Sequence, residues 1–160
     1  MALTENRAVL DWIDEMAAMT QPDAIVWIDG SEAQLEALRS QACATGELEK
    51  LNQEKLPGCY LHRSAVNDVA RVEGRTFICT RKEEDAGPTN NWMDPKEAYE
   101  KLGKLFDGAM KGRTMYVIPY CMAHVGSPFA KVGIELTDSI YVVLSMAIIF
   151  PGIGSLRASQ

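Results

Sequence analysis

The sequence predicts an α/β fold in which helices flank a mixed β-sheet. Its first 45 residues follow the order helix, strand, turn and helix, which is typical of an α/β lobe. A third helix with strong start signals begins near residue 95, and two strand-like apolar runs follow it. With 160 residues, the chain can bury about 70% of its unfolded surface in one core.

The N-terminal elements are expected in quick succession. A helix is predicted from Thr4 to Met19, with Thr4 as its N-cap, because apolar residues recur there at helical spacing. The apolar run Ala24 to Ile28 predicts a short buried strand. Asp29-Gly30-Ser31 is then expected to form a turn, from which Ser31 caps a second helix that ends near Thr45 with Gly46 as C-cap.

The central part reads as loops around one well-marked helix. Thr76 to Thr80 is a strand candidate, and Lys82 to Asn91 is expected to be a charged loop. Asp94 as N-cap and Pro95 at the first helical position predict a helix that ends near Asp107. Its apolar side chains are expected to face inward, and these are Tyr99, Leu102, Leu105 and Phe106.

Three apolar segments complete the expected elements. Thr114 to Pro119 and Val132 to Leu136 predict strands. Ser139 to Phe150 fits a strand or a helix equally well, because a short apolar run does not separate the two.

Charge and composition exclude several function classes. The net charge of −6 and the isoelectric point near 4.9 argue against binding to nucleic acids or to anionic membranes. We see no secretory signal and no apolar run long enough to cross a membrane, so a cytoplasmic protein is expected. The four cysteines form no C-x-x-C pair and are expected to be free, buried thiols.

Two short basic stretches are candidates for binding an anion. Arg71 and Arg75 lie four residues apart, and Lys111 and Arg113 flank a glycine. Arginine can hold a carboxylate or phosphate through two parallel hydrogen bonds. From spacing alone, the more common alternative is a structural salt bridge. Its expected acceptors are Asp68, Glu73 or Asp107.

Other polar clusters are less specific. The loop Gly126-Ser127-Pro128, with His124 nearby, could present backbone N–H groups to an anion or form an ordinary turn. Asn90-Asn91-Trp92 could contact a ligand or pack a loop. We find no catalytic triad, paired-carboxylate site or metal-ligand cluster, so residue patterns alone indicate an α/β lobe with an anion-binding face.

Six short stretches of the sequence, called words below, are more specific than these polar clusters. Together, and in this order, they resemble the N-terminal part of GTP-dependent phosphoenolpyruvate carboxykinase over residues 6–146. The words are Val26-Trp-Ile-Asp-Gly-Ser31, Asp68-Val-Ala-Arg-Val-Glu73, Asp85-Ala-Gly-Pro-Thr-Asn-Asn-Trp92, Lys111-Gly-Arg-Thr-Met-Tyr-Val-Ile-Pro119, Gly126-Ser-Pro128 and Leu136-Thr-Asp-Ser139.

The resemblance implies a reaction and one substrate contact. The family converts oxaloacetate and GTP to phosphoenolpyruvate, GDP and CO2 for gluconeogenesis, with Mn²⁺ and a nucleotide-associated Mg²⁺. Arg71 matches the family's substrate-binding arginine in its Val-Ala-Arg word, whereas Arg75 and Arg113 are expected to be structural. The family's metal ligands, phosphate loop and guanine pocket match nothing in this sequence, and its members are usually monomeric.

Two departures from the family pattern bear on what the chain can do. Met122-Ala123-His124 stands where the family usually has Met-Gly-Pro. From Ala147 onward the family pattern stops, so we expect a lobe over residues 1–146 and a divergent tail over 147–160, as in a truncated, frame-shifted or partial copy.

The resemblance therefore leaves two functional hypotheses. The first is a fragment of the enzyme that contributes Arg71 but is inactive alone. The alternative is a non-catalytic lobe that binds small dicarboxylates or another protein. A third possibility is that the chain does not fold stably, because its missing partner leaves apolar surface exposed, which we expect at Ile140 to Phe150.

Overall fold

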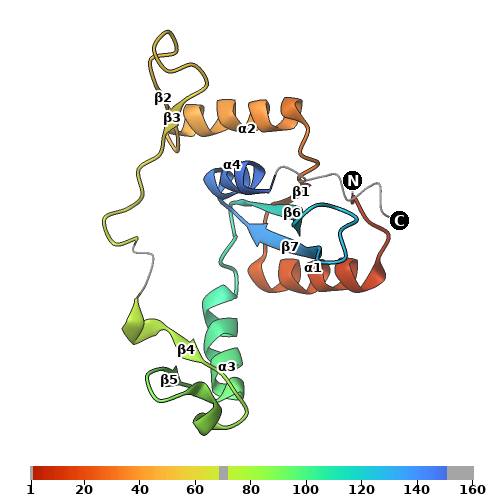
Figure 1. Ribbon diagram of the computed structural model, residues 1–160, viewed down its shortest axis with the longest axis vertical. Helices are drawn as coiled ribbons and strands as arrows, with labels where there is room; N and C mark the ends of the chain where they lie inside the picture. Colours follow the sequence, from red (N-terminus) through yellow and green to blue (C-terminus); the bar gives the residue numbers. More distant parts are fainter. Residues whose placement is uncertain (1, 69–71, 151–160) are drawn as a thin grey trace.

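A three-stranded mixed sheet lies at the centre of the protein (Figure 1). The structure is a computed structural model that describes residues 2–68 and 72–150. Strand β6 (Thr114–Met122) is central, between β1 (Ala24–Trp27) and β7 (Lys131–Thr137). β1 runs parallel to β6, and β7 runs antiparallel to it, which confirms the expected mixed sheet.

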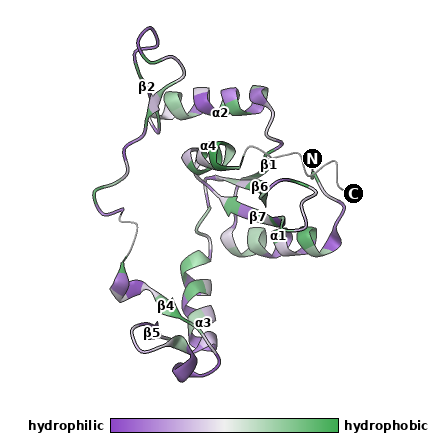
Figure 2. Cartoon of the chain, viewed as in Figure 1, coloured by the Kyte–Doolittle hydropathy of each residue, from purple (hydrophilic) through white to green (hydrophobic). Residues whose placement is uncertain are grey.

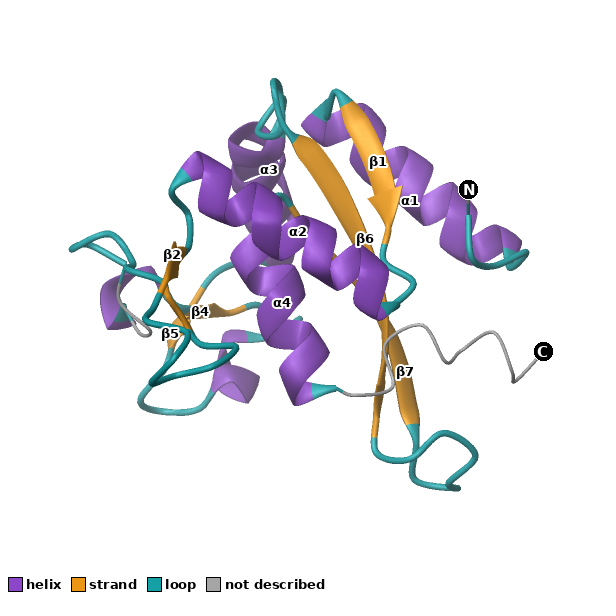
Figure 3. Ribbon diagram, turned by 90° about the horizontal axis from the view of Figure 1, so that it is seen from above, coloured by secondary structure: helices purple, strands orange, loops and turns teal. Residues whose placement is uncertain are grey.

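Helices cover both faces of this sheet, as Figure 3 shows. Helix α1 (Arg7–Thr20) packs on one face, while α2 (Glu32–Thr45) and α4 (Ile140–Ile149) pack on the other. Alternate residues of β6 therefore serve two separate cores, since successive side chains of a strand point to opposite faces. Met115 and Val117 contact the α1 side, whereas Tyr116 and Ile118 join the α2 and α4 side.

The ends of the first two helices follow local capping rules. The N-cap of α1 is Asn6, whose side chain accepts hydrogen bonds from the N–H groups of Ala8 and Val9. The expected N-cap Thr4 is wrong, because its hydroxyl oxygen accepts a hydrogen bond from the N–H of Asn6 instead. The caps predicted for α2 are confirmed: the Ser31 hydroxyl accepts from the N–H of Gln34, and Gly46 has a φ of 79°.

The residues between α2 and β6 form small elements and one further helix. β2 (Glu49–Lys50) and β3 (Tyr60–Leu61) pair antiparallel, and β4 (Phe77–Ile78) and β5 (Asn91–Trp92) pair parallel. The end of the expected charged loop is thus a strand. Two 3₁₀ turns, Glu73–Arg75 and Glu83–Ala86, complete this part.

Helix α3 (Pro95–Phe106) starts as predicted but does not face a core. The Asp94 side chain accepts hydrogen bonds from the N–H groups of residues 96 and 97. Among its residues, only Ala98 is buried. The expectation that its large apolar side chains face inward is wrong, although the helix does carry hydrophobic and hydrophilic residues (Figure 2). Those side chains are exposed by 82% at Tyr99, 50% at Leu102, 73% at Leu105 and 47% at Phe106.

The ambiguous apolar segment near the C-terminus is a helix. The Ser139 hydroxyl caps α4 by accepting a hydrogen bond from the N–H of Val142. Ile140, Val143 and Met146 are buried against the sheet. Helix α4 continues without a break through residue 146, where the sequence predicts the end of the lobe. The division at 146 stays a prediction.

Candidate functional site

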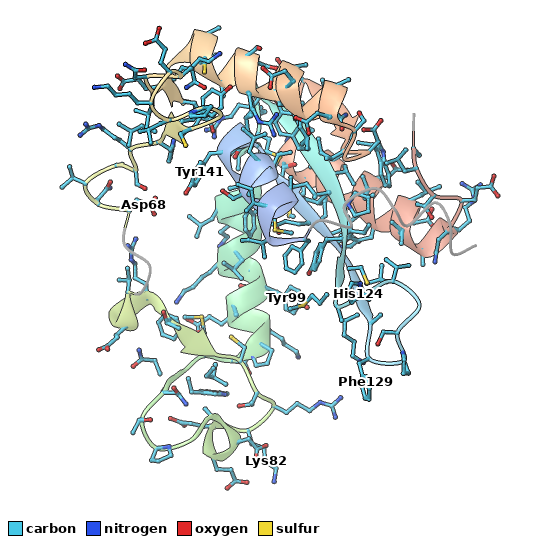
Figure 4. All side chains as sticks on the ribbon, turned by 45° about the horizontal axis from the view of Figure 1, so that its top comes forward. Asp68, Lys82, Tyr99, His124, Phe129 and Tyr141 are labelled. Atoms are coloured by element: carbon cyan, nitrogen blue, oxygen red, sulfur yellow. The ribbon has the colours of Figure 1, made fainter. Side chains whose placement is uncertain are left out.

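The predicted substrate arginine, Arg71, lies outside the described residues, but its surroundings in the chain are defined. On its N-terminal side a turn ends at Asp68 (Figure 4), whose N–H donates to the Ala65 carbonyl oxygen. On its C-terminal side the 3₁₀ turn Glu73–Arg75 begins after Val72, whose carbonyl oxygen accepts from the Thr76 hydroxyl. Arg71 is thus bracketed by two turns between β3 and β4.

The Asn90-Asn91-Trp92 cluster holds the turn on the C-terminal side of Arg71, Glu73–Arg75, and the loop after it. The Asn91 side-chain amide donates to the carbonyl oxygens of Glu73, at 2.8 Å, and Thr76, at 3.2 Å. The Trp92 indole N–H donates to the Thr80 carbonyl oxygen, and the Asn90 amide donates to that of Ala86. All three side chains therefore satisfy loop backbone groups, as the loop-packing interpretation of this cluster requires.

The other basic candidates do not form a cluster among the described residues. Arg113 pairs with Asp138, so the salt-bridge interpretation is right in kind although the acceptor is not one of the three expected. This pair joins the residue before β6 to the residue after β7. Arg75 is exposed and lies within ion-pairing distance of no described carboxylate.

The loop between β6 and β7 forms a tight turn. The Ser127 N–H donates to the His124 carbonyl oxygen, and the Ser127 hydroxyl accepts from the N–H of Phe129. Gly126 has a φ of 87°. Both N–H groups are engaged within the turn, so the turn interpretation of this loop fits better than an anion cradle.

A pocket of about 590 Å³ that sequence reasoning missed opens between α2, β3 and α4. The rings of His62 and Tyr141 stack in it with their centroids 3.9 Å apart (Figure 4 labels Tyr141). His62 Nδ1 lies 2.7 Å from the Glu47 carbonyl oxygen, and because a carbonyl only accepts, Nδ1 carries the proton. Arg39 lines the same pocket, and the hydrogen bond that its guanidinium donates to the Glu32 carboxylate is the main cause that raises its pKa.

Glu47 forms hydrogen bonds that connect His62 and the start of α4 beside this pocket. Its carboxylate oxygen accepts from the Ser139 hydroxyl at 2.9 Å and from the Tyr141 N–H at 2.8 Å, at the start of α4. Its charge also contributes to raising the pKa of the buried Tyr116, although burial is the larger cause and a hydrogen bond from Gln41 opposes both. No local pattern predicts these contacts, because more than 90 residues separate the partners.

The described residues offer no ready metal site. No group of three or more histidine, cysteine, aspartate or glutamate side chains comes together within the described ranges. All four cysteines are free thiols, as predicted. The expected burial is right only for Cys121, because Cys59 and Cys79 are exposed and Cys43 is half-buried. No helix in the described part of the chain has the length and hydrophobicity to span a membrane.

Comparison with known proteins agrees with the six sequence words. The model of the phosphoenolpyruvate carboxykinase N-terminal domain family matches residues 11–152. Phosphoenolpyruvate carboxykinase (GTP) of Anaeromyxobacter sp. strain K is 60% identical over 145 residues, which is 91% of this chain and 24% of that protein. The enzyme of the same name from Corynebacterium glutamicum strain R is 51% identical over 147 residues, which is 92% of this chain and again 24% of the relative.

The chain thus spans about a quarter of the length of the curated relatives it matches. The family match extends over most of the chain and includes the whole sheet, α2, α3, α4 and α1 from residue 11 onward. On this evidence of sequence and coverage, the chain belongs to the phosphoenolpyruvate carboxykinase N-terminal domain family.

Proposed function

We propose that the chain forms the substrate-binding N-terminal part of a GTP-dependent phosphoenolpyruvate carboxykinase. The observation that carries this proposal is the 60% identity to a protein of that name across 91% of the chain. The reaction would remove CO2 from oxaloacetate and pass the terminal phosphoryl group of GTP to the resulting enolate oxygen, giving phosphoenolpyruvate and GDP. A cytoplasmic, monomeric enzyme acting on these small molecules is part of the same proposal.

The nucleotide and metal would bind outside this chain. The described residues supply no cluster suited to a divalent cation, so we assign Mn²⁺, Mg²⁺ and GTP to the remaining three quarters of a family polypeptide. The bound metal would supply positive charge to stabilise the negative charge that develops on decarboxylation. The chain alone would therefore lack activity.

The role proposed for Arg71 is to hold the anionic substrate. Both oxaloacetate and phosphoenolpyruvate carry carboxylates, and a guanidinium group can bind one through two parallel hydrogen bonds. The described turns on either side of Arg71 support this role, since Asn91 holds the C-terminal one through the Glu73 carbonyl oxygen. In a chain with a net charge of −6, a local cation favours the approach of such an anionic substrate.

A chimeric enzyme tests this function. Residues 1–146 of this chain would replace the matching segment of the Anaeromyxobacter sp. strain K enzyme, and GTP-dependent phosphoenolpyruvate formation would be measured. Arg71→Ala should lower kcat/KM by at least about 10- to 150-fold, since a hydrogen bond to a charged group contributes about 1.5–3 kcal/mol. Arg75→Ala is the matched control and should retain activity.

Two results would contradict the proposal. Equal activity of the chimera with and without Arg71→Ala would remove Arg71 from substrate binding, and phosphoenolpyruvate formation by the isolated chain would show that it does not need the missing part. Calorimetry of the isolated chain with oxalate tests the alternative function as a dicarboxylate binder. Binding there that is lost with Arg71→Ala would support an anion site that works in this chain by itself, whereas no binding in either variant would leave an interaction module.

A further inference from the structure

Helix α3 presents an apolar face that the described residues leave uncovered. This α3 face consists of Tyr99, Leu102, Leu105 and Phe106, and Tyr99 is labelled in Figure 4. At 3.6 residues per turn, the four positions fall within an arc of about 120°, which is the width of the stripe that a surface helix normally buries. Here the side chains at Tyr99 and Leu105 are 82% and 73% exposed.

The α3 face continues onto the neighbouring surface of the sheet. Met19, near the end of α1, lines a shallow depression together with Tyr99 and Gly103. Met19 and Phe106 also line a groove of about 370 Å³ that reaches Ile134 on β7. The two hollows therefore join α3 to the sheet in one mainly apolar surface, and methionine suits such a surface because its side chain adapts to a partner.

Charged groups border this surface on the other side of α3. Glu97 and Lys101 form an ion pair of 2.6 Å one turn apart, and Glu100 and Lys104 line the depression beside Tyr99. An aromatic and aliphatic centre with a charged rim is the usual composition of a protein contact surface. A contiguous apolar patch on a protein surface is also typical of a site that binds another protein segment.

We propose that the α3 face is covered by the part of a phosphoenolpyruvate carboxykinase polypeptide that lies outside this chain. The chain corresponds to only 24% of its relatives, so the larger part of a family polypeptide remains to be accommodated against it. This explains why α3 is amphipathic, because the rest of the family polypeptide would bury its apolar face. The inference rests on family membership and not on the role proposed for Arg71.

Hydroxyl-radical labelling with mass spectrometry tests this proposal without reference to activity. The isolated 160-residue chain and the chimera described above would be labelled side by side. Labelling of Tyr99 and Leu105 should fall at least about tenfold in the chimera, because an interface excludes water from its centre. Val66, which is fully exposed, and Ile28, which is fully buried, are the controls and should be labelled alike in both proteins.

A pair of variants gives a second readout. Leu105→Lys should lower the melting temperature of the chimera, whereas it should leave that of the isolated chain within about 1–2 °C, since exposed substitutions have small effects. Val66→Lys, in the turn before Asp68, where the side chain is fully exposed, is the matched substitution that should spare both proteins.

Three outcomes would overturn the inference. Equal labelling of Tyr99 in the two proteins would show that the family polypeptide leaves the face open. Low labelling in the isolated chain at every concentration would show that the chain covers its own face. Protection in the isolated chain that grows with concentration would assign the face to a second copy.

Discussion

Ala123 has a backbone conformation that usually belongs to glycine. Its φ is 78°, and within the described residues Gln21 is the other non-glycine residue with a positive φ. The resemblance described above implies a glycine at this place, in the Met-Gly-Pro word. A Cβ atom in the left-handed region costs about 1–2 kcal/mol, so the departure noted in the sequence has a physical cost.

Ala123→Gly should therefore stabilise the protein. The expected gain in the free energy of unfolding is about 0.5–1 kcal/mol, because relief of the left-handed strain exceeds the entropy that glycine adds to the unfolded chain. Urea unfolding followed by circular dichroism measures it. Ala130→Gly, in the same loop but without a positive φ, should destabilise, and a gain of the same size there would refute the strain explanation.

Tyr116 predicts a dependence of stability on alkaline pH. Burial, aided by the charge of Glu47, raises the pKa of its phenol above the ordinary value of 10.0. Above that pH the unfolded state loses the proton before the folded state does, so the free energy of unfolding falls as the pH rises through the folded pKa. Tyr116→Phe should flatten this fall, as measured by urea midpoints at several pH values between about 8 and 11. An unchanged alkaline slope would exclude Tyr116 as its source.

Single-residue roles could be predicted only where the partners are close in sequence. The Ser31 and Asp94 caps were predictable, since each side chain bonds a backbone group two or three residues away. The contacts of Glu47 with the start of α4 and the pairing of Arg113 with Asp138 were not, because the fold brings these residues together. The proposed role of Arg71 came from resemblance and stays a prediction.

At the scale of elements, local sequence predicts where a helix starts but not what it packs against. The 3.6-residue period of α3 shows that the helix has an apolar face, yet whether that face meets a core depends on residues far away or on another domain. The apolar segment of α4 shows the opposite case. Its sequence did not separate helix from strand, while the structure buries Ile140, Val143 and Met146 against the sheet.

Helices α2 and α3 should respond differently to the same substitution. Leu38→Ala on α2, where the side chain is 6% exposed, should cost about 2–5 kcal/mol by leaving a cavity. Leu105→Ala on α3, where it is 73% exposed, should change the free energy of unfolding by less than about 0.5 kcal/mol. Chemical denaturation of the isolated chain compares them. A large loss with Leu105→Ala would mean that α3 is packed in solution.

At the scale of the whole molecule, stability should be concentrated in the sheet. Met115, Val117 and Ile118 of β6 are fully buried between two layers of helices. β4 and β5 have only two residues each, and the β4 side chains are about 40% exposed. Local opening is easiest where few apolar contacts must be broken.

Amide hydrogen exchange of the isolated chain should show this gradient. The amides of β6 should exchange only through global unfolding and therefore most slowly, whereas those of β4, β5 and α3 should exchange through local opening. Exchange by mass spectrometry on peptides from each element measures the difference. Similar protection of α3 and β6 would mean that the molecule opens as a single unit.

The parallel pairing of β1 with β6 affects how the protein can fold during its synthesis on the ribosome. Ala24 pairs with Thr114, so β1 emerges long before the strand that must lie beside it. At about 5–20 residues per second, some 90 residues of synthesis take roughly 5–20 s. Throughout that interval the apolar strand and the face of α1 that rests on the sheet have no partner. We therefore expect this nascent segment to be prone to aggregation until β6 has emerged.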